Sequence, residues 1–254
     1  MHPEAARRPS AAIGAAGVAF AVAGFVLVHV VFAHLVFWLA GMFVAETIDG
    51  PARTGAGPAL AIDLGLIALF GLQHTGMARR SFKRATAWLV APGLERAVYV
   101  WCAVIALFLV VACYQPIPDT VWHVDHPAGV AAIWVAFTAG WAMAAAAYLS
   151  VGIPHLLGVS QALAWRRGEP PPPPPLVEGR VYGLVRNPQQ LGLLVAFWAT
   201  PHMSLGHLVF ACAMTVYIFV GMAFEERDLA ATHGEAFRAY KARVPRIVPR
   251  LFGR

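Results

Sequence analysis

Long apolar runs, separated by short polar and charged segments, dominate the pattern of the chain. The runs cover residues 11–44, 58–77, 97–114, 128–151 and 189–224. Each approaches or exceeds the roughly 20 residues that a helix needs to cross the hydrocarbon layer of a membrane. The pattern therefore predicts an all-α fold made of transmembrane helices.

The last run is too long for one span, and Pro201 interrupts it. Because proline removes a backbone donor and breaks a helix, we predict two spans at 189–200 and 204–224, joined by a tight turn as a helical hairpin. The first of them is short for a full crossing, so either it spans the membrane or the turn lies inside the bilayer. The predicted fold is a polytopic bundle of about five to six spans that ends in a cytoplasmic tail.

Composition supports the same class of protein. Apolar residues make up 59% of the chain and charged residues only 13%, whereas a soluble domain carries about 25% charged residues. Arg7 and Arg8 precede the first run, as in a signal peptide, but that run is far longer than a signal-peptide core. We interpret it as a retained first span of an integral membrane protein.

The distribution of Lys and Arg predicts the orientation. With the N-terminus in the cytoplasm, every one of the 19 Lys and Arg residues except Arg53 falls on the cytoplasmic side, as the positive-inside rule requires. Both termini are then cytoplasmic, and the lipid bilayer is the expected partner. The net charge of +6 is explained by anionic lipid, so we expect no nucleic-acid partner.

A run of six prolines at 170–175 marks the clearest boundary in the chain. Consecutive prolines form a stiff extended rod of about 3.1 Å per residue, which suits a spacer along the membrane surface. We therefore divide the chain into N-terminal transmembrane helices at 1–168, a proline-rich connector at 169–181 and a C-terminal hairpin and tail at 182–254.

Charged groups at the membrane boundary are the candidates for chemistry. Glu225 and Glu226 lie at the inner end of the last predicted span, where a carboxylate needs a partner or water. Glu225 lies one residue deeper in the apolar run and is expected to matter more. Asn187 and Pro188 form a helix start with Asn187 as its cap, and Arg186 beside it is either an interface anchor or a receptor for a ligand carboxylate.

Spaced residues in the C-terminal third resemble a known family, and a segment near residue 73 supports the likeness. These residues are Tyr182, Arg186, Pro188, Gly192, Pro201, Gly206, Glu225, Glu226, Gly234, Phe237, Tyr240 and Pro245, with Gln73, His74, Glu95, Arg96 and Tyr99 in the first half. They resemble the membrane methyltransferases related to isoprenylcysteine carboxyl methyltransferase, and within them the bacterial methanethiol S-methyltransferases and their NnrU-type relatives.

The resemblance implies a helical bundle whose hairpin and tail enclose S-adenosylmethionine, in a bacterial inner membrane. It implies methyl transfer to a small apolar thiol, methanethiol giving dimethyl sulfide, without a metal. The expected cofactor-binding residues are Tyr182, Arg186, Asn187, Pro188, Gly192, Glu225, Glu226 and Tyr240. The expected catalytic residues are His74, Asn187 and His207.

Two residues depart from the family pattern. Asn187 stands where the family has histidine, and Gln190 stands where it commonly has an aromatic residue. Asparagine can donate a hydrogen bond but cannot accept a proton near neutral pH, so another group must act as base. His74 is the best candidate because it lies near the cytoplasmic end of its span, whereas His202 and His207 lie at the far turn of the hairpin.

Two other functional classes stay open. A haem protein would need paired intramembrane histidines, but His29 and His34 are five residues apart and project about 140° from each other on one helix. A non-enzymatic membrane protein is the other alternative, and the departures at Asn187 and Gln190 favour it. The oligomeric state is not indicated by the pattern.

Overall fold

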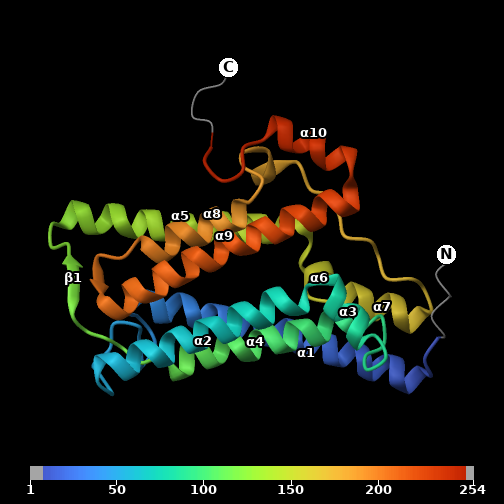
Figure 1. Cartoon of the computed structure of the whole chain (residues 1–254), viewed down its shortest axis with the longest axis horizontal. Helices are drawn as coiled ribbons and strands as arrows, with labels where there is room; N and C mark the ends of the chain where they lie inside the picture. Colours follow the sequence, from blue (N-terminus) through green and yellow to red (C-terminus); the bar gives the residue numbers. More distant parts are fainter. Residues whose placement is uncertain (1–7, 250–254) are drawn as a thin grey trace. The chain divides into compact units, whose positions relative to one another are not determined.

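The structure is a computed structural model that describes residues 8–249. Helices account for nearly all of the regular structure (Figure 1). The α-helices are α1 Ala11–Ala40, α2 Ala56–Met77, α3 Arg80–Thr86, α4 Glu95–Cys113, α5 Pro127–Val151, α6 Ile153–Leu156, α7 Val159–Arg167, α8 Pro188–Trp198, α9 Leu205–His233 and α10 Glu235–Arg243. A 3-10 helix η1 (Arg180–Gly183) and two strands, β1 (Thr120–His123) and β2 (His202–Ser204), complete the described elements.

Five of these helices, α1, α2, α4, α5 and α9, are long and apolar enough to cross a membrane. The predicted all-α polytopic bundle is therefore confirmed, and the chain is a multi-pass membrane protein. The first predicted span ends earlier than expected, at Ala40, because Gly41 adopts a left-handed conformation (φ 68°) and its N–H bonds Phe37 O. Glycine takes this helix-ending conformation without steric cost.

The described residues form two compact units, each built from three stretches of chain. The first unit contains α1, most of α2, α3, α4, α6 and α7, and the second contains the start of α2 and all elements from 115 to 151 and after 174. The division of the chain at residues 168 and 181 was based on the predicted roles of successive segments, and not on contacts in space. It stays a prediction.

In the first unit, α1 and α4 run parallel and α7 covers their N-terminal ends. Gly17 of α1 lies so close to Leu94 and Trp165 that an added Cβ would meet them at 3.1 and 2.7 Å. At the other end of the same helices, the Trp38 and Tyr114 rings meet edge to face at 5.2 Å. Small residues on α1 thus allow the close approach of its neighbours.

In the second unit, α8 packs between α5 and α9 (Figure 1). The contact of α5 with α8 is very close, because a Cβ added at Gly140 would lie 2.7 Å from Gly192 O and 2.8 Å from Ala196 N. Only glycine permits backbones to approach in this way. This contact positions the start of α8, where the predicted site residues lie.

The turn between α8 and α9 is not the tight turn that was expected. α8 has 11 residues, about 17 Å at 1.5 Å per residue, which is too short for a crossing. The chain instead continues in an extended form to β2, which pairs antiparallel with β1 just before α5. The segment from Asn187 to Ser204 therefore reaches the β1–β2 end of this unit without being helical throughout.

The last span also differs from its predicted end at residue 224. α9 continues without interruption to His233, through Glu225 and Glu226, and α10 follows after Gly234. The helical segment beyond the apolar run is polar, so hydropathy alone could not detect it. Its consequence is that both glutamates stand on a rigid helix.

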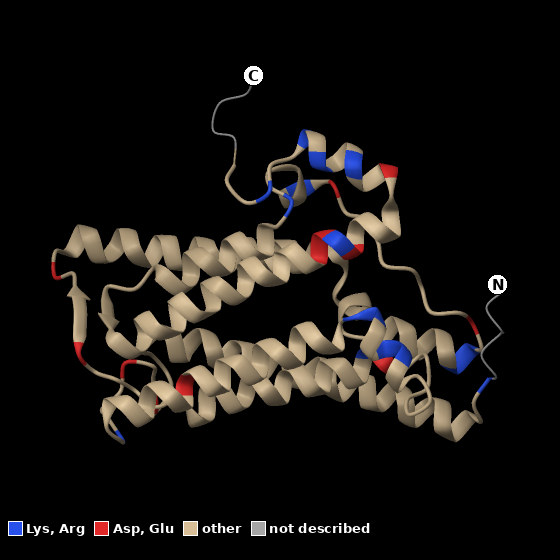
Figure 2. Ribbon diagram, in the orientation of Figure 1, with Lys and Arg blue, Asp and Glu red and all other residues tan. Residues whose placement is uncertain are grey.

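Most Lys and Arg residues gather at one end of the helices within each unit, whereas several acidic residues lie at the other end (Figure 2). In the second unit these are the basic residues of η1, the last turns of α9, α10 and the following tail, whereas Arg53 lies before the start of α2. The predicted cytoplasmic cations Arg7, Arg250 and Arg254 lie outside the described residues.

Candidate active site

The residues before α8 are joined to the C-terminal tail by backbone hydrogen bonds. Arg186 N donates to Pro245 O at 2.8 Å, and Asn187 N donates to Arg246 O at 3.1 Å. Two segments that are far apart in sequence therefore lie side by side at the start of α8.

The Arg186 side chain is the main cross-link in this region. Its Nη1 donates to Val244 O at 2.6 Å and to Lys241 O at 3.3 Å. Its Nε and Nη2 donate to Glu226 Oε1 at 3.2 and 3.0 Å. The side chain is only 7% exposed, so its charge is balanced mainly by Glu226. Arg186 thus holds α9, α10 and the tail together.

Asn187 contributes to the same network and is only 5% exposed. Its Nδ2 donates to Glu226 Oε1 at 3.2 Å and to Arg246 O at 3.0 Å. The expectation that its side chain caps α8 is wrong: Asn187 is at the N-cap position but makes no side-chain cap bond. Pro188 does occupy the first turn, as predicted.

Glu226 is the centre of this network. Its Oε1 accepts from Arg186 and Asn187 and lies 3.5 Å from Arg246 Nε. The Glu226 side chain is 13% exposed, whereas Glu225 is exposed to solvent. Glu226 is therefore the more buried of the two, although Glu225 comes one residue earlier in the apolar run, because successive helical residues point about 100° apart. The expectation that Glu225 matters more for cofactor binding stays a prediction.

Glu225 faces a separate, more open group of side chains. Gln190 Nε2 donates to Glu225 Oε2 at 3.0 Å. The pKa of Tyr182 is raised well above its ordinary value by burial first, and then by the negative charge of Glu225 and by Tyr240. Glu225, Gln190 and Tyr182 therefore lie together at the membrane-boundary end of the second unit.

Tyr240 secures η1 against α10. Its hydroxyl donates to Tyr182 O at 2.7 Å, and its ring packs with Phe237 and Val244 in a small buried cluster. Burial raises the pKa of Tyr240 to about 12, with nearby charges adding smaller effects. The neutral hydroxyl is thus kept as a donor that supports Tyr182.

Curated methanethiol S-methyltransferases align with nearly the whole chain. The protein from Mycobacterium tuberculosis (strain ATCC 25618 / H37Rv) is 37% identical over 231 residues, which cover 91% of this chain and 94% of that relative. The protein from Pseudomonas deceptionensis is 35% identical over 254 residues, covering 99% and 97%. The chain belongs to the methanethiol S-methyltransferase family. The family resemblance of the sequence is thereby confirmed.

A more distant group of relatives also matches this member of the methanethiol S-methyltransferase family. The Nurim homolog of Drosophila melanogaster is 30% identical over 200 residues, covering 75% of this chain and 78% of that protein. No family model matches the chain. No solved structure matches it either.

His207 does not lie with the other predicted site residues of this family member. It is near the first turn of α9, 18 positions before Glu225 on the same helix, a separation of about 27 Å at 1.5 Å per residue. Its Nδ1 lies 3.2 Å from Asp49 Oδ2 and its Nε2 lies 3.2 Å from Phe197 O. The side chain is 1% exposed, and its contacts connect the last turn of α8 to the segment before α2.

Asp49 is a well-supported partner for His207. Burial acts to raise the pKa of Asp49, but the hydrogen bonds and charge of His207 and the bonds of Ser204 outweigh burial and hold this pKa below its usual value. The carboxylate is thus favoured in its ionised form. A catalytic role for His207 stays a prediction.

His74 belongs to the first unit, in the last turn of α2. Its ring lies 5.1 Å from the Tyr99 ring and 5.3 Å from the Phe70 ring. The Arg96 guanidinium lies 4.7 Å above the same Tyr99 ring, so an imidazole, a phenol and a cation are grouped at this end of α4. The predicted role of His74 as base is untested by these contacts.

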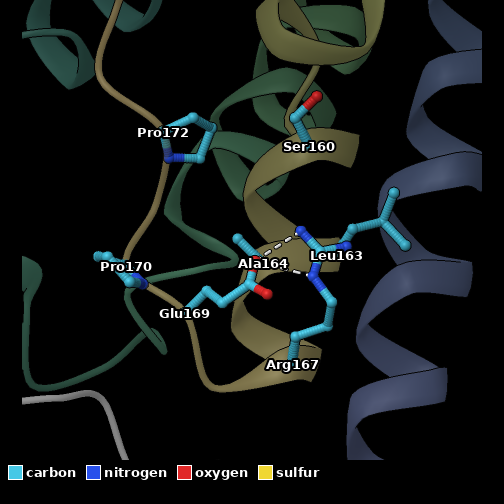
Figure 3. A pocket seen from close by; sticks show the side chains of 7 residues that line it. All are labelled: Ser160, Leu163, Ala164, Arg167, Glu169, Pro170 and Pro172. Carbon is cyan, nitrogen blue, oxygen red and sulfur yellow. Dashed lines mark hydrogen bonds and ion pairs between the residues drawn. The ribbon is translucent and has the colours of Figure 1, made fainter.

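A shallow pocket of about 230 Å³ lies on α7 and the first prolines of the connector (Figure 3). Its lining includes the exposed ion pair between Arg167 and Glu169, whose atoms lie 2.7 Å apart. It contains none of the predicted site residues. The pocket therefore does not contribute to the candidate active site.

Two residues that contact the site glutamates were not predicted as site residues from the sequence. Arg246 joins Glu226 from the tail, and Gln190 joins Glu225 from α8. Gln190 was noted only as a departure from the family pattern, and no sequence signal indicated Arg246.

Proposed function

We propose that this chain is an integral membrane S-methyltransferase that uses S-adenosylmethionine to convert methanethiol to dimethyl sulfide. The observation that carries the proposal is the alignment of 99% of the chain with a methanethiol S-methyltransferase at 35% identity. The grouping of Arg186, Glu226, Glu225 and Tyr182 at one end of the second unit supports it.

The proposed site divides its labour between the two neighbouring glutamates. Glu226 already accepts from Arg186 and Asn187, so its role is to hold the tail in place as a positioning residue. Glu225 is exposed and contacts the neutral Gln190. We assign Glu225 to the positive charge of the cofactor, because an accessible carboxylate favours a cation near it.

The first turn of α8 is assigned to the carboxylate of the cofactor. Because the Asn187 side chain bonds Glu226 and Arg246 O, it leaves this turn without a side-chain cap. Free N–H groups and the positive end of the helix dipole favour an anion there. Gly192 and Pro188 keep this end of α8 close to α5 and correctly started.

S-adenosylmethionine, when bound, supplies a methyl group on a positively charged sulfur. The protein's contribution is to align the thiol with that methyl and to exclude water, which favours a reaction that consumes charge. His74 is proposed to accept the thiol proton, since Asn187 cannot. The contacts of His207 with Asp49 and Phe197 O favour a structural role for that residue.

The proposed location is the bacterial inner membrane, with both termini in the cytoplasm. The concentration of Lys and Arg at one end of the helices within each unit supports this orientation. Reporter fusions at the two ends of the chain test it. Reporters on opposite sides of the membrane would refute the topology.

The deciding experiment measures binding and turnover with detergent-solubilised protein. Calorimetry with S-adenosylmethionine and S-adenosylhomocysteine should show binding, and gas chromatography should detect dimethyl sulfide from methanethiol. Arg186→Lys should weaken the binding of the cofactor and lower the rate of dimethyl sulfide formation. The reason is that the single point charge of lysine cannot reproduce the fork of donors of arginine. Folded protein that binds neither compound would refute the proposal and favour a non-enzymatic role.

A further inference from the structure

The β1–β2 junction is a rigid element of the second unit that methyl transfer does not use. Val124 N donates to Pro201 O at 2.9 Å, Leu205 N to Asp119 O at 2.7 Å and Gly206 N to Ile117 O at 3.0 Å. Thr200 adds two further links, since its O accepts from Trp122 Nε1 and its Oγ1 donates to His202 O. These bonds hold the two strands together in a pairing that has one irregularity, between Thr120 and Trp122.

This register places two histidines directly opposite each other. His123 and His202 are partners across the strands, and residues opposite each other on antiparallel strands have adjacent side chains. Their Nδ1 atoms lie 3.3 Å apart. The His123 side chain is 55% exposed, so the pair is open to water.

Asp125 determines which nitrogen of His123 carries the proton. Its Oδ1 lies 2.7 Å from His123 Nε2, and a carboxylate is an acceptor, so Nε2 is the protonated nitrogen. In this tautomer the Nδ1 atom of His123 carries no proton, and its lone pair accepts the hydrogen bond from His202 Nδ1. A carboxylate that orients a histidine in this way is a recurrent companion of metal ligands.

The distance between the two Nδ1 atoms matches that of two ligands on one metal ion. Two zinc–nitrogen bonds of about 2.05 Å at a tetrahedral angle place the nitrogens about 3.3 Å apart, and the observed separation is 3.3 Å. We propose that His123 and His202 form a binding site for a divalent transition-metal ion in tetrahedral coordination, with Zn²⁺ as its representative. Binding requires only that the Nδ1 proton of neutral His202 moves to its Nε2.

Water would complete this site. Within residues 8–249 no group of three or more His, Cys, Asp or Glu side chains is arranged to hold a metal. With only two protein ligands, the site is expected to bind the metal ion reversibly. The bound ion would join the segment before α5 to the segment before α9. Zinc that binds only the folded chain would stabilise it by RT ln(1 + [Zn²⁺]/Kd).

Calorimetric titration of Zn²⁺ into the full-length, untagged, detergent-solubilised protein tests the proposal. One ion should bind, and His123→Ala and His202→Ala should each lower the affinity at least about tenfold. Asp125→Ala should lower it by about tenfold, the lower limit for an orienting residue. His126→Ala, a neighbouring exposed histidine, is the matched control and should change the affinity less than about twofold.

Two further observations make the result decisive. Each variant should keep the melting temperature of the parent in the absence of metal, which separates a lost ligand from a lost fold. Co²⁺ bound to the parent should show the strong visible absorption of tetrahedral coordination, and His123→Ala should abolish it. Zn²⁺ affinity that is equal in the parent, His123→Ala and His202→Ala, or a loss in His126→Ala as large as in those variants, would overturn the assignment.

Discussion

Replacing Glu226 with glutamine is the sharpest test of the network in which Glu226, Arg186 and Asn187 hold the C-terminal tail. The change keeps the size of the side chain and removes the charge that faces Arg186 at 3.0 Å. It also places an amide group beside the donors of Arg186 and Asn187. Because the Arg186 side chain is only 7% exposed, water cannot replace the lost carboxylate.

The expected loss of stability can be estimated from this geometry. Removing one partner of a buried ion pair costs about 3–5 kcal/mol. Glu226 keeps 13% exposure and Arg186 keeps its bonds to Val244 O and Lys241 O, so we expect about 2–3 kcal/mol, below that range. This corresponds to a fall in melting temperature of roughly 4–12 °C for a chain of this size.

Glu225→Gln is the matched control, because it makes the same chemical change one residue away at an exposed position. It should change the unfolding free energy by less than about 0.5 kcal/mol while weakening cofactor binding. Melting is followed by intrinsic fluorescence in detergent, and release of the tail by trypsin cleavage after Arg243 and Arg246. If Glu226→Gln shows the melting temperature and cleavage rate of the parent, the network does not hold the tail.

Three further predictions concern the site and its support. Asn187→His should leave the methylation rate at or below that of the parent. It should lower the free energy of unfolding by about 1 kcal/mol, because a neutral imidazole has one N–H where the amide donates twice. A faster rate that titrates near about pH 6.5 would contradict this prediction. Gly192→Ala should cost about 1–3 kcal/mol in denaturation experiments, since the added methyl would meet Ala144 N at 2.6 Å. Gly221→Ala, where nothing lies within 4 Å, is its control, and equal stability of the two variants would exclude the close helix contact. For Tyr240 the pKa is raised to about 12, so the folded chain keeps the phenol neutral while the unfolded chain ionises near about pH 10. Stability should therefore fall as pH rises from about 10 to 12, and a pH series of denaturation should show a smaller fall for Tyr240→Phe than for the parent.

The positions of the spanning helices could be predicted from the sequence alone. The predicted runs 58–77, 97–114 and 128–151 match α2, α4 and α5 within two residues at each end. This succeeds because the length of an apolar run is a one-dimensional property, set by the thickness of the hydrocarbon layer. Pro201 likewise indicated the end of α8, since proline ends a helix wherever the chain folds.

Local spacing carried the resemblance to the family, which the relatives confirm. Arg186, Asn187, Glu226 and Tyr240 were predicted as site residues before any contact was known. The structure brings them together, and their role in cofactor binding stays a prediction. The sequence could not tell which glutamate is buried, because the direction of a helix face depends on the elements that pack against it. It also gave no sign of Arg246, whose contact with Glu226 joins distant parts of the chain.

Only the tertiary structure decided how polar segments are used. The continuation of α9 to His233 lies beyond the last apolar run, where hydropathy carries no information. The pairing of β1 with β2 joins a polar segment to the break within that run, and hydropathy does not indicate strand partners. The contact of His207 with Asp49, a residue 158 positions away, likewise appears only in the folded chain. Hydrophobic length is encoded locally, whereas the partner of a buried polar group is chosen by packing, and packing is a property of the whole folded unit.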